Sequence, residues 1–136
     1  MSQQMGNIIV SPGTNVWPHE LRTAKAFASR GHDVYFPEID NNDYHNSPDA
    51  VIFGLTWEMK SPRSPNTAKI LKVVREALHQ STNVIYDSQR IKNLTDLQIE
   101  RELRRIAPML KALKNLLFVN RKRDLVVIKQ SQRFDI

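Results

Sequence analysis

The sequence predicts an α/β domain in which a mixed β-sheet is flanked by helices. Stretches whose apolar residues recur every three or four positions, typical of helices, take turns with short alternating or apolar stretches, typical of strands. The expected order is one helix, three strands, a helix, a strand, a helix and two strands. Because the chain has 136 residues, we expect a single domain over residues 1–136, with residues 1–12 as a linker or an edge strand.

A helix and a strand open the predicted domain. Pro18 suits the first turn of a helix, and Gly31 suits the position just beyond its end. Val34 and Phe36 then fall on one face of a strand. The polar residues 38–47 that follow are expected to form a loop.

The most regular stretch is a predicted hairpin over residues 49–60. We expect it to turn at Gly54-Leu55, because glycine at the first of two central positions favours a type II′ turn. With that turn, Asp49 faces Lys60 across the two strands. Since residues i and i+2 of a strand share a face, Asp49, Glu58 and Lys60 then all project to one side of the sheet.

The remaining elements follow the same reading. Residues 66–80 form an amphipathic helix and residues 83–86 a short strand. Thr95 opens a third helix through a capping box, and Pro108 kinks or restarts that helix. Residues 116–129 form a last hairpin with a basic tip.

Positive charge is concentrated late in the chain. Residues 1–60 hold 4 Lys/Arg and 7 Asp/Glu, a net charge of −3, whereas residues 61–136 hold 16 and 7, a net charge of +9. This asymmetry indicates a polyanionic partner, with a merely solubilising surface as the alternative. The absence of cysteine excludes disulfides, cysteine-bound metals and thiol nucleophiles. Neither a membrane-spanning apolar run nor a signal-peptide pattern is visible in this sequence.

The crowded charges of the predicted hairpin indicate a divalent metal site. Two carboxylates at this spacing can hold a hard cation such as Mg²⁺, and the cation can lower the pKa of a bound water. Lys60 can orient that water or stabilise a phosphate that gains charge. The alternative is a solvated cross-strand pair of Asp49 and Lys60, but the apolar neighbours on both strands favour a covered position.

Pro48-Asp49, followed after eight residues by Glu58-Met59-Lys60, resembles the signature of the PD-(D/E)XK nuclease superfamily. The resemblance implies a type II restriction endonuclease-like core, metal ligation by Asp49 and Glu58, and Lys60 as the catalytic lysine. Mg²⁺ is the metal expected, with Mn²⁺ or Zn²⁺ as alternatives. The superfamily often adds a carboxylate from its first helix, and Glu20 is the candidate for that catalytic and metal-binding role. A first-turn Glu that only answers the helix dipole is the alternative.

A closer likeness is carried by Trp57-Glu58-Met59-Lys60-Ser61-Pro62 and by Asn83-Val84-Ile85-Tyr86-Asp87 after the intervening helix. These residues resemble the tRNA-nuclease C-terminal domain of CdiA-type contact-dependent growth inhibition toxins. The resemblance implies an endonuclease toxin that is secreted or delivered from a cell surface, acts in the cytoplasm of the target bacterium, and is neutralised by an immunity protein. A DNase of the same superfamily and a non-catalytic nucleic-acid-binding module are the alternatives.

Substrate contacts are expected at the carboxyl edge of the sheet. A right-handed crossover makes the strand at 83–86 parallel to the strand that ends at Lys60, so both end at the edge where ligands of α/β sheets bind. We expect Arg63 and Arg90 to hold phosphates there, because guanidinium matches phosphate geometry. Lys69 adds attraction for a nucleic-acid backbone, and Gln80 either binds substrate or ends its helix.

Two further features are expected to be less important. Trp17 is expected to pack in the core or under a lid rather than to stack on a base. The basic tip Arg121-Lys122-Arg123 is expected to be solvated, although it can add general attraction for nucleic acid. An acidic partner protein would match the same basic half of the chain.

Overall fold

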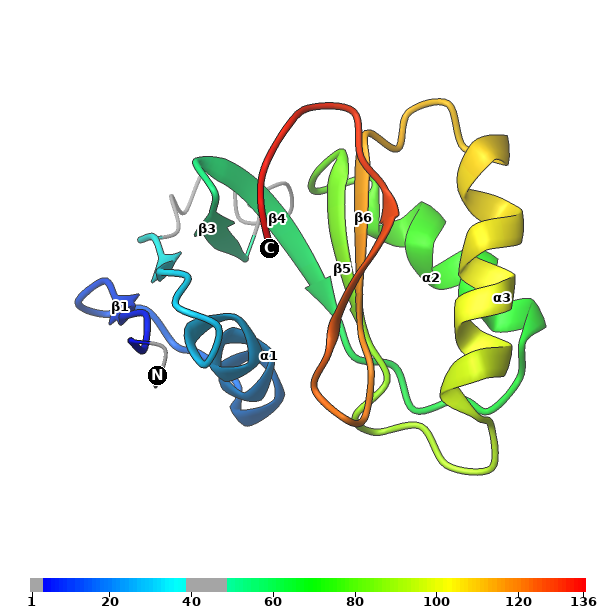
Figure 1. Ribbon diagram of the computed structural model, residues 1–136, viewed down its shortest axis with the longest axis horizontal. Helices are drawn as coiled ribbons and strands as arrows, with labels where there is room; N and C mark the ends of the chain where they lie inside the picture. Colours follow the sequence, from blue (N-terminus) through cyan, green and yellow to red (C-terminus); the bar gives the residue numbers. More distant parts are fainter. Residues whose placement is uncertain (1–3, 39–48) are drawn as a thin grey trace.

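Figure 1 shows the fold of the protein in a computed structural model, which describes residues 4–38 and 49–136. Within these residues seven strands form one sheet whose order follows the chain from β1 to β7. The strands are β1 (Ile8–Val10), β2 (Val34–Phe36), β3 (Ala50–Ile52), β4 (Leu55–Lys60), β5 (Asn83–Asp87), β6 (Asn115–Val119) and β7 (Leu125–Lys129). The helices are α1 (Pro18–Ala28), α2 (Ala68–Ala77) and α3 (Asp96–Ile106), followed by the 3₁₀ turn η2 (Ala107–Met109).

The sheet is mixed, and the predicted α/β class is confirmed. Parallel pairing joins β1 to β2, β4 to β5 and β5 to β6, and antiparallel pairing joins the other neighbours. The edge strand β1 lies within the segment for which a linker or an edge strand was expected. Most of the predicted loop at residues 38–47, together with Pro48, lies outside the described residues.

Two buried clusters cover the two faces of the sheet. One packs α2 and α3 against β5 and β6, and the other packs α1 against β2, β3 and β4. Figure 1 shows α1 separated by the strands from α2 and α3. No helix in the described ranges is both long and apolar enough to cross a bilayer.

The third helix begins as its sequence predicts, but it ends before Pro108 instead of being kinked or restarted there. The Gln98 N–H donates to Thr95 Oγ1 at 3.1 Å, and the Gln98 side chain accepts from the Thr95 N–H at 2.9 Å, which is the reciprocal capping box. The helix stops at Ile106, and Pro108 lies in the 3₁₀ turn η2. Proline therefore ends this helix, because it offers no N–H for the next helical hydrogen bond.

The predicted turn of the hairpin is wrong by one residue. Ile52 pairs with Leu55, so the two central residues are Phe53 and Gly54, and their φ angles are 57° and 72°. Two positive φ angles define a type I′ turn rather than type II′. The pairing of the strands therefore shifts by two positions, and Val51 lies opposite Thr56.

Ring packing explains why a phenylalanine occupies the left-handed conformation, which is rare for bulky residues. The Phe53 ring stacks on Phe134 at 5.0 Å between centroids and meets the rings of His32 at 4.9 Å and Phe27 at 6.1 Å. Phe134 also packs edge-on against Trp57 at 5.7 Å. These aromatic contacts stabilise a turn that local propensity alone does not favour.

The shift changes which side chains meet but not the face on which they lie. Side chains alternate with a period of two, so a shift of two positions keeps the whole set on the same side. The Asp49 N–H donates to the Trp57 carbonyl at 2.9 Å, which places Asp49 alongside Glu58. The expectation that Asp49 faces Lys60 is thus wrong, because the hairpin turns at Phe53-Gly54 and not at Gly54-Leu55.

Candidate active site

Two carboxylates meet where β3 begins beside the middle of β4. The Asp49 carboxylate accepts the Met59 N–H at 2.8 Å, which fixes the side chain against the backbone of β4. Glu58 is 5% exposed, and it exchanges a hydrogen bond with Asp49. The hairpin therefore brings together the two acids that the sequence predicts as metal ligands.

Burial makes the charged form of this pair unfavourable. The pKa of Asp49 is raised to about 8, first by removal of the carboxyl from water and then by the neighbouring Glu58. A pKa this high indicates that the fold does not compensate the negative charge that the carboxyl group gains when it loses its proton. Such a pair favours an external cation, or a proton when no cation is present.

Glu20 adds a third carboxyl from the first turn of α1. Its Oε1 accepts the Trp17 N–H at 2.9 Å, so it caps the helix, as the alternative interpretation expected. Its carboxyl group also lies close to that of Asp49. Burial and then the Asp49 carboxyl raise the pKa of Glu20 to about 7. Glu20 thus combines the two expected positions, at the helix start and beside the acid pair.

The residues present fit a cation held by two carboxylates. Mg²⁺ binds commonly through one or two carboxylates, with waters and substrate phosphates as its other ligands. Across residues 4–38 and 49–136, no group of three or more His, Cys, Asp or Glu is arranged to hold a metal ion. Asp49 and Glu58 are therefore the pair that could carry the metal, and Glu20 could complete the site only by a side-chain movement.

Lys60 ends β4 two residues beyond Glu58, on the same face of the strand. It lies opposite Tyr86 of β5, and its side chain is partly exposed. In the described part of the chain, no carboxylate lies within ion-pair distance of Lys60. Its ammonium group can therefore meet an anion from solution.

Arg90 is anchored directly after this lysine. Its Nε donates to the Ser61 carbonyl at 2.7 Å, and Gln89 Nε2 lies 3.2 Å from Ser61 Oγ. Strands β4 and β5 are parallel and end together, as the predicted crossover requires. The expectation that residues 87–90 lie near Lys60 is confirmed.

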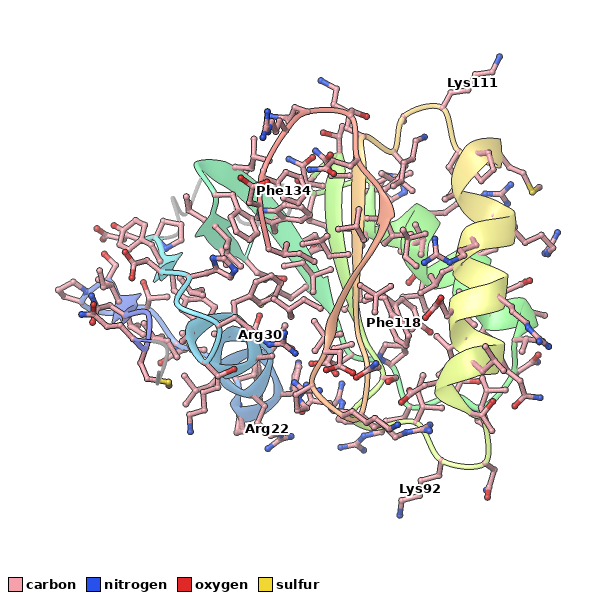
Figure 2. All side chains as sticks on the ribbon, in the orientation of Figure 1. Arg22, Arg30, Lys92, Lys111, Phe118 and Phe134 are labelled. Carbon is pink, nitrogen blue, oxygen red and sulfur yellow. The ribbon has the colours of Figure 1, made fainter. Side chains whose placement is uncertain are left out.

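A basic cleft opens along this edge of the sheet. Arg63 and Arg90 line a hollow of about 560 Å³ together with Lys92, and the same two arginines line a second hollow of about 400 Å³ beside α1. Figure 2 shows Arg22 and Lys92 at the same end of the molecule, with side-chain nitrogens gathered between them. The predicted phosphate-binding arginines are thus neighbours in an open, positively charged site.

The other two predicted contacts lie apart from each other. Lys69 is exposed in the first turn of α2, on the side of the sheet edge where β4 ends. Gln80 follows the end of α2, near the point where the Ser81 hydroxyl donates to the Thr56 carbonyl at 2.9 Å. Gln80 therefore belongs to the opposite end of β4 from Lys60, and a shared site for the two would have to span that strand.

A buried clip at Asp87 is the main feature that sequence reasoning missed. Asp87 is fully buried and accepts hydrogen bonds from both terminal nitrogens of Arg123, at 2.9 and 2.8 Å. It also accepts the Thr23 hydroxyl at 2.6 Å and Gln89 Nε2 at 2.8 Å. These bonds join α1, the end of β5 and the last hairpin around the Gln89 side chain, whose Nε2 also lies 3.0 Å from the His19 carbonyl.

The tip of the last hairpin is solvated at Arg121 and Lys122, as expected, but the fold also holds the side chains of Arg121 and Arg123, which was not expected. Arg121 Nη2 donates to the carbonyls of Ile91 and Leu94, and Arg123 donates to Asp87 and to the Arg22 carbonyl. The signal that could have indicated this is Asp87, a charged residue that ends an apolar strand. Charge so placed needs a partner, and arginine can supply a two-pronged one.

Comparison with known families gives the next observation. The model of the contact-dependent growth inhibition CdiA C-terminal domain matches residues 46–132, which is more than half of the chain. The chain belongs to this family. The match includes Asp49, Glu58, Lys60, Arg63 and Arg90.

A solved structure resembles this CdiA C-terminal domain over most of its length. It is a CdiA-CT/CdiI toxin and immunity complex from Burkholderia pseudomallei, with a TM-score of 0.70 and 19% sequence identity. The alignment covers 91% of this chain and 99% of the other, which shows that the fold is shared. No curated protein sequence matches the chain.

The family match divides the candidate site of this CdiA domain into two parts. The hairpin acids and the lysine lie inside residues 46–132, whereas Trp17, His19 and Glu20 lie outside that range. The first turn of α1 thus contributes to the site from a segment that the family model does not match.

Proposed function

We propose that this CdiA C-terminal domain is a metal-dependent endonuclease of PD-(D/E)XK type, and that it hydrolyses phosphodiester bonds in tRNA. The observation that carries the proposal is the pair of the half-buried Asp49 and the buried Glu58, where removal from water and the second carboxyl raise the pKa of Asp49 to about 8, beside Lys60 and an arginine-lined cleft. Acids that hold a cation next to cations that hold phosphates match the needs of phosphodiester hydrolysis.

Asp49 and Glu58 are the residues proposed to hold the metal. A divalent cation bound there would supply a water of lowered pKa and positive charge beside the scissile phosphate. The Met59 N–H holds one oxygen of Asp49 at 2.8 Å, so the carboxylate keeps its direction whether or not a cation is present. Glu20, already close to Asp49, adds negative charge that strengthens the attraction for the metal.

Lys60 and the arginines act on the substrate. The Lys60 ammonium projects from the same face as Glu58 and is proposed to stabilise charge that develops on the phosphate. Arg63 and Arg90 are proposed to hold the flanking phosphates, and Arg90 has its position fixed by the Ser61 carbonyl.

The biological setting follows from the family. We propose that the domain acts as a toxin, reaches the cytoplasm of a neighbouring bacterium by contact-dependent delivery, and is neutralised by a cognate immunity protein. The similar Burkholderia pseudomallei chain was solved as a toxin and immunity complex, which supports such a partner. The high positive charge of residues 61–136 suits an acidic immunity protein as well as nucleic acid.

The test is cleavage by the purified domain of total bacterial RNA and of plasmid DNA, with and without Mg²⁺, Mn²⁺ or Zn²⁺. We expect full-length tRNA to be converted into shorter fragments only when a divalent metal is present. The variant Asp49→Asn, which removes one proposed metal ligand, should lose this cleavage. Asp135→Asn, which changes an exposed acid of the carboxyl tail, is its matched control and should keep the cleavage. Cleavage of DNA alone would replace tRNA by a DNase activity, and cleavage that survives EDTA would contradict the metal site.

A further inference from the structure

Trp17 has an unusually exposed side chain for a residue beside a candidate active site. Its side chain is 66% exposed, the highest fraction among the large apolar residues described, whereas Trp57 is fully buried. Of the two expected positions of Trp17, in the core or under a lid, packing in the core is therefore wrong. A tryptophan side chain that exposes so much apolar surface to water can gain free energy when a ligand covers it.

The hydrogen bonds that Trp17 makes to other described residues come from its backbone. Its N–H donates to Glu20 at 2.9 Å, and its carbonyl accepts the Leu21 N–H at 3.0 Å, bonds that other residue types could make equally well. The indole ring lies beside the imidazole of His19, whose plane is within 18° of its own at a centroid distance of 6.4 Å. The two rings form a flat apolar ledge at the start of α1.

Positive charge surrounds this ledge. Trp17 and His19 line the hollow of about 400 Å³ together with Arg22, Arg63 and Arg90. Arg22 donates to the Gln89 side chain and Arg90 to the Ser61 carbonyl, so both are held in place by neutral acceptors. Three guanidinium groups gathered in one hollow repel one another, as the effect of Arg63 and Arg22 on the pKa of Arg90 shows, and an incoming phosphate would relieve that repulsion.

Two shifted pKa values agree with this picture. Partial burial and then Arg63 and Arg22 lower the pKa of Arg90, which reflects the crowding of like charges. Burial and then Arg90 lower the pKa of His19. Both shifts include the effect of the positive charge gathered beside the ledge.

We propose that the Trp17 and His19 ledge binds one unpaired nucleobase by stacking, while Arg63 and Arg90 hold the phosphates on either side of it. Aromatic rings beside a basic groove are how proteins hold single-stranded nucleic acid. The inference rests on the proposed nuclease function and adds a subsite to it. Because Glu20 follows His19 directly and lies close to Asp49, the stacked nucleotide belongs within a nucleotide or two of the bond that is cut.

The subsite makes a demand on the substrate. A base inside a duplex has both faces covered by its neighbours, so it cannot stack on the ledge without leaving the helix. The strand held here must be unpaired near the scissile bond, as in a loop or a single-stranded end. This is a preference for the structural state of the RNA, not for its sequence, because every base offers an aromatic face.

Fluorescence of the exposed indole provides the test. A Lys60→Ala variant, blocked in cleavage, is titrated in Mg²⁺ with a short single-stranded RNA, a fully paired RNA duplex and inorganic polyphosphate. We expect the single strand to quench the emission of Trp17 strongly, and the duplex and polyphosphate to quench it little. In Lys60→Ala/Trp17→Phe, only the buried Trp57 emits and the quenching should vanish.

Binding of the same RNA by further variants separates stacking from charge. We expect Trp17→Ala in the Lys60→Ala background to bind the single strand roughly 5- to 100-fold more weakly, and Trp17→Phe to keep most of the affinity. Met109→Ala, which removes a side chain that is 56% exposed on η2, should bind as the parent does. Equal affinities for the Ala and Phe variants, or equal quenching by polyphosphate, would overturn the subsite.

The outcomes distinguish this inference from the proposed function. Base-dependent quenching in a domain that never cuts RNA would refute the nuclease and leave the subsite standing. Metal-dependent cleavage without any quenching of Trp17 would refute the subsite and leave the nuclease standing.

Discussion

Two carboxylates of this domain, the half-buried Asp49 and the fully buried Asp87, have opposite surroundings. Asp87 accepts hydrogen bonds from Arg123, Thr23 and Gln89, and the guanidinium group compensates its charge from within the fold. Among the described residues, Asp49 accepts the Met59 N–H, and the side chains that shift its pKa are the acids Glu58 and Glu20. The two sites lie on opposite sides of β4, since Asp49 directly precedes β3 and Asp87 ends β5.

The difference predicts that Asp87 is a structural acid and that Asp49 is a functional one. A carboxylate whose partners all belong to the chain stabilises the fold and is not available to a ligand. A carboxylate surrounded by other acids destabilises the fold in its charged form and gains a partner only from outside. The contrast predicts that the same chemical change, Asp to Asn, has opposite effects at the two positions.

The largest expected effect is loss of activity at Asp49. Asp49→Asn should lower the rate of RNA cleavage by about 100-fold or more, because one of the two proposed metal ligands loses its charge. The midpoint of urea unfolding should stay the same or rise, since an uncompensated acid has been removed. Cleavage assays beside urea titrations measure both, and full activity with an altered midpoint would reverse the assignment.

At Asp87 the same change should act on stability. Asp87→Asn leaves Arg123 without its two-pronged partner in a buried site, and breaking such a pair costs about 3 kcal/mol or more. Urea unfolding of the purified variant measures this loss. If the variant unfolds like the parent but no longer cuts RNA, Asp87 belongs to the active site and the comparison fails.

The pH dependence of stability should report the acid pair. The pKa of Asp49 in the folded protein is about 8, above its ordinary value, so its contribution is present in acid and is lost as pH rises through 8. Without metal, the free energy of unfolding should fall between pH 5 and pH 9 by at least about 1 kcal/mol, the equivalent of one pKa unit.

The matched measurements for this pH series are Asp49→Asn without metal and the parent with Mg²⁺. The variant should show a flatter dependence on pH. Added Mg²⁺ should raise the stability most at the alkaline end, because it binds the deprotonated acids. A parent protein that is equally stable at pH 5 and pH 9 without metal would count against the uncompensated pair.

The smallest expected effect concerns the basic cleft. Arg63→Ala should weaken binding of tRNA several-fold and reduce the slope of log affinity against log salt by about one, as for one lost phosphate contact. Lys111→Ala is the matched control, because Figure 2 shows Lys111 at the end of the molecule away from Arg22 and Lys92. Equal slopes for the two variants would remove Arg63 from the interface.

The sequence was informative where the periodicity of strands decides the outcome. The face shared by Asp49, Glu58 and Lys60 follows from alternation along the strands, and it survives the wrong turn because the error is an even number of positions. The exact partner of Asp49 depends on whether Phe53 or Leu55 occupies the turn. Rings from distant parts of the chain settle that choice, and local sequence rules do not include them.

Side chains whose partners are distant were the hardest to predict. Arg123 looked like one of several charges at a hairpin tip, yet it reaches Asp87, which lies 36 residues earlier in the sequence. Trp17 looked like core because tryptophan usually is, and only the position of α1 at the rim of the cleft leaves it exposed. Residue type alone did not distinguish these positions from their ordinary counterparts.

The ring of Phe134 gives the last residues of the chain an influence on chemistry far from them. It lies against Phe53, so a chain shortened before residue 134 would lose one of the rings that keep the turn in its left-handed form. The hairpin could then adopt the competing bend at Gly54-Leu55, in which Asp49 meets an amine instead of a second acid. A cut in the carboxyl tail would thereby replace the proposed metal-binding pair by an internally neutralised one without altering any of the acids themselves.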